Sequence, residues 1–374
     1  MIFDIKKEAI ELSQALIRRE SISPNDGGCL DFIANYFRNL NLEVEFIDFG
    51  DVKNLYVKNG SEESLCFAGH VDVVPPGYTW THDPFEAKII DDVLYGRGAV
   101  DMKIGIACAM AVFKSILMKN PKAPLSMLLT SDEEALAENG LKKVVPRLKE
   151  KGEKFKFFLL GEPTCKSEPG DQIKIGRRGS VTAKIEFLGL QGHIAYPELA
   201  DNPIPRIVKA CSELMDLDFE DEDSVFGKSK IQLTSIDNNN DVENLIPGTG
   251  SVMFGIRFNP KQSFESIKSK VLEVLEKTAK PYLINWRFHG LPFVVDDSKL
   301  IGKLVNSIKS VTQKDVVFDA KGATSDGRFL TKLAPVFEIG LQEDLAHKID
   351  ERASLKDIKI LCDIYGKIFN DFLV

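Results

Sequence analysis

Five side chains that commonly bind metal ions share one kind of position in this sequence: each follows an apolar, strand-like run or a glycine-rich turn, where a loop begins. The five are His70, Asp101, Glu134, Glu162 and His347. In open α/β sheets, ligands bind beyond the carboxyl ends of the strands, so residues far apart in sequence can converge there. Zinc accepts both imidazole nitrogen and carboxylate oxygen, and a bridging carboxylate would let this set hold two ions. The pattern predicts a metal-dependent hydrolase.

The chemistry of such a site also needs a group that moves protons. Two metal ions about 3.5–4 Å apart can polarise a carbonyl and lower the pKa of a bound water from about 15.7 to about 7. Glu133 can carry the proton to the leaving nitrogen, because it directly precedes the ligand Glu134 and must point its side chain elsewhere. Asp72 follows His70 by two residues, so we expect its carboxylate to accept the second imidazole N–H and fix the ligating tautomer.

Each motif also has an ordinary structural explanation. A single His-x-Asp is usually a surface pair, adjacent glutamates usually begin a solvated helix, and Gly-Glu-Pro usually forms a turn. The functional interpretation is favoured because all five ligands occur together, each after a predicted strand or turn.

Composition limits the class of protein. A chain of 374 residues is longer than one hydrophobic core usually supports, which predicts two domains. The net charge of −8 argues against a nucleic-acid partner, because phosphate binding needs a concentrated lysine and arginine surface. Charged residues interrupt the N-terminal segment, and the longest apolar run, 104–113, is about half of a membrane-spanning length. With six cysteines and no CxxC pair, we expect a cytoplasmic protein.

Hydrophobic periodicity predicts an α/β fold with a mostly parallel sheet. The predicted helices of the first part cover 4–19, 30–40, 102–118 and 138–149, and the predicted strands cover 42–47, 55–57, 65–69, 125–130 and 156–160. The αβ pattern resumes after Pro292, with helices near 298–311 and 354–373 and strands at 316–318 and 335–339.

The middle of the chain has a different pattern. Apolar residues alternate with polar ones from Val181 to Phe187, as in a half-exposed strand. Strands at 180–188, 230–236, 250–258 and 282–288 and helices at 203–216 and 263–279 follow in βαββαβ order. This order is typical of a ferredoxin-like unit, whose sheet edge can pair with a neighbouring chain. We therefore expect a discontinuous catalytic domain, 1–178 and 292–374, and an inserted dimerisation or lid domain, 179–291.

Several longer motifs carry a family resemblance. They are Phe67–Gly77, Thr130–Ala135, Gly176–Ser180, Gln191–Pro197 and Thr324–Phe329. The chain resembles the dizinc amidohydrolases that include aminoacylase and carboxypeptidase G, and within that family it is most similar to the desuccinylase branch. The resemblance implies hydrolysis of N-succinyl-LL-2,6-diaminopimelate to succinate and LL-2,6-diaminopimelate, a step toward lysine.

The resemblance also implies roles for individual residues. His70 and Glu162 would bind one zinc ion, Glu134 and His347 the other, Asp101 would bridge them, and Glu133 would be the general acid and base. His193 would reach across a homodimer and stabilise the oxyanion in the partner's site. The substrate carboxylates would contact Arg177, Tyr196, Asn244, Arg257, Thr324 and Ser325. Cobalt is expected to substitute for zinc, because imidazole and carboxylate ligands suit several divalent ions.

Four positions depart from the family pattern. Ile104 and Ala323 replace glycines, Glu243 replaces an amide, and Glu343 lies where an asparagine is usual. Extra carboxylates near an acidic substrate would be unfavourable unless they pair with basic groups. A related deacylase such as acetylornithine deacetylase, or a dipeptidase, is therefore an alternative. A non-catalytic binding protein on the same fold is disfavoured by the presence of Glu133 with all five ligands.

Overall fold

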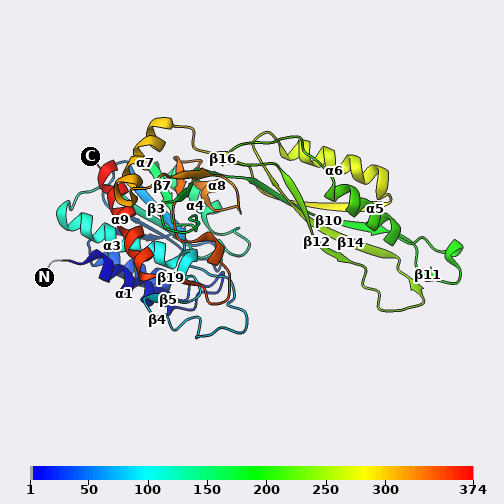
Figure 1. Cartoon of the computed structure of the whole chain (residues 1–374), viewed down its shortest axis with the longest axis horizontal. Coiled ribbons are helices and arrows are strands. Elements are labelled where there is room, and N and C mark those ends of the chain that lie inside the picture. Colours follow the sequence, from blue (N-terminus) through cyan, green and yellow to red (C-terminus); the bar gives the residue numbers. More distant parts are fainter. Residues whose placement is uncertain (1–2, 323, 374) are drawn as a thin grey trace. The chain divides into compact units, whose positions relative to one another are not determined.

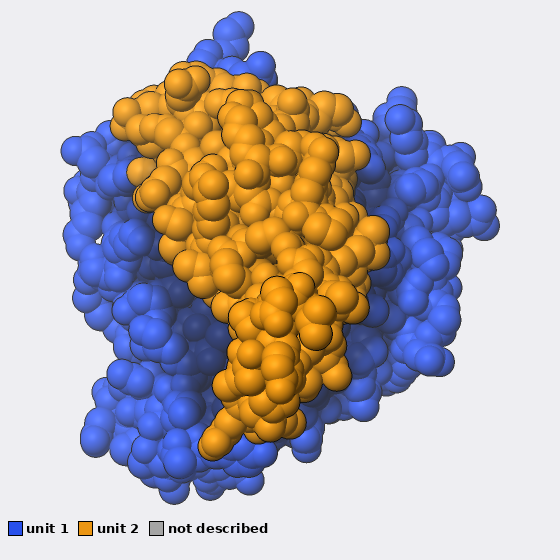
Figure 2. All heavy atoms as spheres, turned by 90° about the vertical axis from the view of Figure 1, so that its right-hand side faces the viewer, with its two compact units in different colours: residues 1–176, 294–319, 325–374 blue, residues 177–293, 320–324 orange. Residues whose placement is uncertain are grey.

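The computed structural model describes residues 3–322 and 324–373, so the Ala323 position lies outside the described residues. The chain forms two compact units, coloured separately in Figure 2. Unit 1 contains residues 1–176, 294–319 and 325–374, and unit 2 contains residues 177–293 and 320–324. The boundaries lie two residues from the expected domain limits, and the assignment of 320–324 to unit 2 was not expected from the sequence.

Unit 1 is built on a mixed sheet of eight strands. The order across the sheet is β1 (Glu43–Phe46), β2 (Asn54–Lys58), β6 (Leu125–Thr130), β3 (Ser64–His70), β7 (Phe155–Leu160), β18 (Val336–Glu338), β8 (Gln172–Lys174) and β17 (Val317–Asp319). The four central strands, β6, β3, β7 and β18, are parallel. β3 and β6 are buried at every position, as expected of parallel strands covered on both faces. The predicted α/β class with a mostly parallel sheet is confirmed.

Helices pack around this sheet, and several of them contribute side chains to the main core. They are α1 (Ile5–Ile17), α2 (Cys29–Arg38), α3 (Ile104–Lys119), α4 (Leu141–Glu150), α7 (Ser298–Thr312), α8 (Gly327–Leu330) and α9 (Leu355–Phe372). The helices α1, α3 and α9 pack side by side (Figure 1). Phe113 of α3 meets Phe369 of α9 edge to face, with ring centroids 4.9 Å apart. Asp4 caps α1 by accepting hydrogen bonds from two backbone N–H groups of its first turn.

Smaller elements of unit 1 were not expected from the sequence. Three short strands, β4 (Lys88–Ile90), β5 (Val93–Tyr95) and β19 (Arg352–Ser354), form a separate sheet. The residues Ala99–Lys103 form a π-helical turn, η1, so α3 begins two residues later than predicted. A predicted helix at 138–149 likewise begins only at Leu141.

Unit 2 is a four-stranded antiparallel sheet with two helices on one face (Figure 1). The strands lie in the order β12 (Lys230–Asp237), β14 (Thr249–Phe258), β10 (Gly179–Leu188) and β15 (Tyr282–Gly290), and the helices are α5 (Ile204–Met215) and α6 (Phe264–Thr278). Val181, Ile185 and their alternating neighbours pack under the helices, so the residues between them face away from the helices. The βαββαβ order predicted for this segment is confirmed.

No helix in the described part of the chain is long and apolar enough to cross a membrane.

Candidate metal centre

The five predicted ligands all lie in unit 1, at or after the ends of strands or within turns and loops. His70 is the last residue of β3, and Glu134 and Glu162 follow β6 and β7. Because these three strands are parallel neighbours, their carboxyl ends meet at one edge of the sheet. Asp101 lies in η1, and His347 lies in the loop after the short 3-10 turn η3 (Glu343–Leu345).

Asp101 lies between the two histidines. Nε2 of His70 is 3.1 Å from Oδ1 of Asp101, and Nε2 of His347 is 3.2 Å from Oδ2 of the same carboxylate. Glu134 and Glu162 add one contact each: Oε1 of Glu134 is 2.9 Å from His347, and Oε1 of Glu162 is 3.8 Å from His70. His70 therefore lies near Glu162, His347 contacts Glu134, and both histidines contact Asp101.

These residues fit two divalent metal ions. The ligand atoms of His70, Asp101 and Glu162 all lie within 4.8 Å of one another, and so do those of Asp101, Glu134 and His347. Each group offers one imidazole nitrogen and two carboxylate oxygens, a donor set that suits zinc and leaves room for a water or substrate ligand. Because Asp101 belongs to both groups, it would be a ligand common to both ions.

The electrostatics of the cluster follow from burial and charge. Burial alone would lower the pKa of His70, which is 1% exposed, but Asp101 and Glu162 outweigh it and raise the pKa. Hydrogen bonds to Asp101 and Glu134 raise the pKa of His347 to about 10. Burial would raise the pKa of Asp101, yet the two histidines hold it below its usual range. The carboxylates around the two histidines therefore favour the protonated form of each imidazole.

Glu133 has the surroundings of a proton carrier. Burial, followed by the charge of Glu162, raises the pKa of Glu133 well above its usual value. The backbone N–H groups of Glu133 and Glu134 donate to Oδ2 of Asp72 at 3.1 and 3.0 Å. Asp72 therefore fixes the backbone of both neighbouring glutamates.

Asp72 differs from expectation in the atom that serves His70. Nδ1 of His70 donates to the backbone carbonyl oxygen of Asp72 at 2.9 Å, whereas the nearest carboxylate oxygen is 3.6 Å away. The carboxylate instead accepts the backbone N–H groups of residues 133 and 134. The expected tautomer can still be fixed, but by the main chain.

A buried ion pair supports two of the ligand loops and was missed by sequence reasoning. The Glu351 carboxylate accepts backbone N–H groups from Gly98, Val100 and Asp101 at 2.8–3.1 Å, and the Arg97 guanidinium at 2.8 Å. Both charged residues are at most 2% exposed. Arg97 also donates to the backbone oxygen of His347 at 3.4 Å. The only sequence signals were an arginine between two glycines before Asp101 and a glutamate four residues after His347.

Lys103 supports the same turn from the other side. Its side chain is fully buried, and the ammonium donates to the backbone oxygens of Leu16 and Arg19 at 3.1 and 2.8 Å. The turn that carries Asp101 is therefore attached to the C-terminal end of α1.

Three predicted substrate-site residues gather in unit 2. His193 lies in β11 (Gly192–His193), which pairs with β13 (Leu245–Ile246). The Asn244 amide is 3.5 Å from Nε2 of His193, and the Tyr196 ring centroid is 5.9 Å from that of His193. His193 and Asn244 are exposed, and Tyr196 is 57% exposed. The three side chains form one accessible cluster at the β11–β13 pair.

The other predicted substrate-binding residues have varied surroundings. Arg177 is buried in β9 (Gly176–Arg177), Arg257 is half-buried in β14, and Thr324 is half-buried in the short segment that joins unit 2. Ser325 belongs to unit 1, where its buried hydroxyl donates to Glu338 and accepts the Gly327 N–H at 3.2 Å. A substrate contact by Ser325 would compete with the bond to Glu338.

The unusual Glu343 has basic partners. Its carboxylate contacts Lys166 and lies 3.0 Å from the ammonium of Lys174, which is 1% exposed. These lysines hold the pKa of Glu343 below its usual range despite its partial burial. The negative charge of Glu343 is therefore balanced by two lysines of unit 1. Glu243, in contrast, is exposed.

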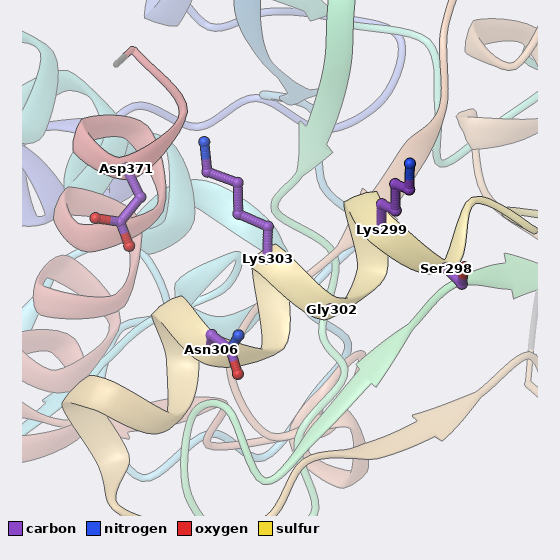
Figure 3. A pocket seen from close by; sticks show the side chains of 6 residues that line it. All are labelled: Ser298, Lys299, Gly302, Lys303, Asn306 and Asp371. Atoms are coloured by element: carbon purple, nitrogen blue, oxygen red, sulfur yellow. The ribbon is translucent and has the colours of Figure 1, made fainter.

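A hollow of about 650 Å³ lies elsewhere in unit 1, between α7 and α9 (Figure 3). Its lining residues are Ser298, Lys299, Gly302, Lys303, Asn306 and Asp371. They include one carboxylate and no histidine, so they do not form a metal-binding group.

Known proteins share both the sequence pattern and the fold. The family described as Peptidase family M20/M25/M40 matches residues 66–371. A succinyl-diaminopimelate desuccinylase of Hydrogenovibrio crunogenus is 40% identical over 98% of this chain and 99% of its own length. An M20 metallo-carboxypeptidase of Sulfolobus solfataricus has a TM-score of 0.84 at 16% identity, with 98% of this chain and 99% of that chain covered. A dinuclear metal-binding M20 peptidase of Bacillus subtilis has a TM-score of 0.71 at 13% identity, with 99% and 98% covered.

Proposed function

This chain belongs to peptidase family M20/M25/M40, and we propose that it hydrolyses N-succinyl-LL-2,6-diaminopimelate to succinate and LL-2,6-diaminopimelate with two zinc ions. It is a homologue of succinyl-diaminopimelate desuccinylases over nearly its whole length. The observation that carries the proposal is that two candidate metal-binding groups share Asp101, and that the carboxyl of Glu133, charge-coupled to their members Glu162 and His70, has a raised pKa.

The ligand roles follow from the two groups. His70 and Glu162 would hold one ion, Glu134 and His347 the other, and Asp101 both. When bound, such a pair of ions polarises the amide carbonyl and lowers the pKa of a coordinated water. The Arg97–Glu351 pair keeps the Asp101 and His347 loops in place, which preserves the geometry of the site.

Glu133 would move the proton that amide hydrolysis requires. As a carboxylate it accepts a proton from the attacking water, and as a carboxylic acid it donates that proton to the leaving nitrogen. A pKa above the usual carboxyl value makes Glu133 a stronger proton acceptor than an ordinary carboxylate. The Asp72 carboxylate accepts the backbone N–H groups of Glu133 and Glu134 and so keeps the main chain of both residues in position. The two side chains would then have different roles, proton transfer for Glu133 and metal binding for Glu134.

Substrate binding would use basic and hydrogen-bonding side chains. Arginine binds carboxylates through two parallel hydrogen bonds, which makes Arg177 and Arg257 the proposed partners of the substrate carboxylates. Tyr196, Asn244, Thr324 and Ser325 would supply further hydrogen bonds. The extra carboxylate of Glu343 is compatible with an acidic substrate, because Lys166 and Lys174 balance its negative charge.

We propose a cytoplasmic homodimer in which His193 acts on the substrate of the partner. Two observations support it: β12 and β15 are the outer strands of the unit 2 sheet, and outer strands offer unpaired backbone groups to another chain. His193 and its neighbours Tyr196 and Asn244 are accessible to a partner. The imidazole would stabilise the oxyanion of the tetrahedral intermediate.

A substrate comparison tests the proposed activity. The zinc-loaded protein should release succinate from N-succinyl-LL-2,6-diaminopimelate much faster than it releases acetate from N-acetylornithine. The exposed acid Glu243, next to Asn244, is the feature that favours a different acyl substrate. Faster deacetylation would replace the desuccinylase assignment while retaining the metal-dependent mechanism.

A further inference from the structure

The open face of the unit 2 sheet carries a hollow of about 450 Å³ whose lining includes none of the residues proposed above to bind the substrate. Its lining includes Thr182, Lys184, Asn285, Arg287 and His289 on β10 and β15. These residues alternate with the side chains that pack under α5 and α6, so they face away from the helices. None of the described lining residues is acidic.

We infer that this hollow is a binding site for a small aliphatic dicarboxylate such as succinate. The site is formed within unit 2 alone, so the inference stands or falls separately from the proposed hydrolysis at the metal centre. Arg287 supplies a planar fork for one carboxylate, and Lys184 supplies a second positive charge.

The strand register sets the spacing of the backbone positions that carry the two charged side chains. Thr182 pairs with Arg287, and Lys184 pairs with Asn285, so Lys184 and Arg287 occupy diagonal positions on neighbouring strands. Such positions are roughly 7–8 Å apart. Two charges anchored at that spacing suit two carboxylates joined by a short aliphatic chain better than one compact anion. Glu186, the next residue on this face of β10, does not line the hollow.

Other features of the hollow also suit a carboxylate ligand. The Thr182 hydroxyl lies 3.1 Å from Nε2 of His289, which orients one hydrogen-bonding pair on the face. Opposite Thr182, the middle of β14 holds Gly255. An added Cβ there would meet only Thr182 and Arg257, at 3.6 and 3.8 Å. A glycine inside a strand often marks a place where a ligand approaches the backbone.

Ligand-observed NMR titration of the full-length zinc-loaded protein with succinate tests the inference. Saturable binding is expected, with binding of butyrate at least roughly tenfold weaker and of succinamide absent, because charge-assisted contacts are lost. Arg287→Gln should weaken succinate binding by roughly tenfold or more. The matched control Lys209→Gln removes a positive charge from exposed α5 and should leave the affinity unchanged.

Two further variants keep the test informative if Arg287→Gln disturbs folding. Thr182→Val keeps the shape of the side chain but removes its hydroxyl, and Gly255→Val adds bulk to the open face without changing charge. Both should weaken succinate binding while the thermal unfolding temperature stays close to that of the parent. Equal binding by all three variants and the Lys209→Gln control would overturn the inference.

Removal of zinc separates this site from the metal centre. Because the hollow contains no proposed metal ligand, succinate affinity should be unchanged after chelation. Loss of binding would place the succinate at the metal centre and overturn the inference.

Kinetics then identify the source of the dicarboxylate. A raised KM in Arg287→Gln would assign the hollow to the succinyl group of the substrate, and an unchanged KM with weakened succinate binding would assign it to free dicarboxylate.

Discussion

Glu133 and Glu134 are neighbours in the chain but meet different surroundings. The Glu134 carboxylate contacts His347 at 2.9 Å, whereas burial and the charge of Glu162 raise the pKa of Glu133. These surroundings support the proposal that Glu134 binds metal and Glu133 carries the proton. The Asp72 carboxylate, which accepts both backbone N–H groups, maintains this division.

Substitution of the two glutamates should separate these roles. Glu133→Gln should leave the zinc content unchanged and reduce kcat by at least ~10²-fold, the lower range of general acid–base contributions. Glu134→Gln should instead lower the zinc content, because a carboxylate ligand is lost. Metal analysis and steady-state kinetics of both variants provide the check. Equal zinc loss in the two variants would contradict the assignment.

The raised pKa values of His70 and His347 predict a pH-dependent metal affinity. Zinc binds deprotonated imidazole, so it must displace the protons that the neighbouring carboxylates favour. In the metal-free protein, His347 stabilises the fold below its unfolded pKa of about 6.5, and this contribution is lost as the pH rises toward about 10. Zinc should therefore raise the unfolding temperature more at pH 9 than at pH 6.

Calorimetry supplies a direct control for this linkage. Zinc titrations at one pH in buffers of different ionisation enthalpy should show net proton release. Proton uptake, or a zinc affinity that falls from pH 6 to pH 9, would contradict the pKa shifts assigned to the two histidines.

At the scale of elements, the metal centre depends on turns as much as on strands. The parallel strands β3, β6 and β7 place three ligands along one edge of the sheet. Asp101 and His347 come from loops, and the Arg97–Glu351 pair contacts both. Breaking this pair should therefore weaken metal binding although every metal ligand is still present.

Glu351→Gln tests that support. It should destabilise the protein by about 3–5 kcal/mol, because removing one partner leaves Arg97 buried without a compensating charge. Zinc affinity should also fall, since outer contacts of metal sites typically contribute about 10–100-fold. Denaturant unfolding and chelator competition measure the two effects. Glu62→Gln, at an exposed position, is the matched control and should change neither quantity.

The elements that the sequence predicted are those with a strong local pattern. Alternation from Val181 to Phe187 predicted β10, and the apolar run before His70 predicted β3. The Arg97–Glu351 pair was not predictable in this way, because its partners are 254 positions apart and no periodicity links them. The same holds for the carbonyl oxygen of Asp72, which replaces the expected carboxylate at His70 because backbone N–H groups occupy that carboxylate.

At the scale of the whole molecule, the proposed active site needs residues from two chains. The ligands and Glu133 belong to unit 1, and His193 belongs to unit 2. A chain that lacks either group should be inactive alone. Their combination in one homodimer is the feature that distinguishes the proposed assembly from a monomeric hydrolase.

Mixing two inactive chains tests the shared site. Heterodimers of Glu133→Ala and His193→Ala chains should regain up to about half of the activity of one parent dimer, because one of the two sites then holds both intact groups. Subunit exchange has to be verified by differential tagging. Verified heterodimers that remain inactive would contradict the role of His193 across the interface.

The central claim is that the two groups sharing Asp101 hold two metal ions and that hydrolysis of the succinyl amide depends on them. Its most direct test is a zinc titration of the chelated protein, with bound zinc per chain and succinate release from N-succinyl-LL-2,6-diaminopimelate measured on the same samples. The account predicts negligible succinate release without metal and a rate that rises until two zinc ions are bound per chain. Full succinate release by the metal-free protein, or saturation with no zinc bound to the His70 and His347 groups, would contradict it.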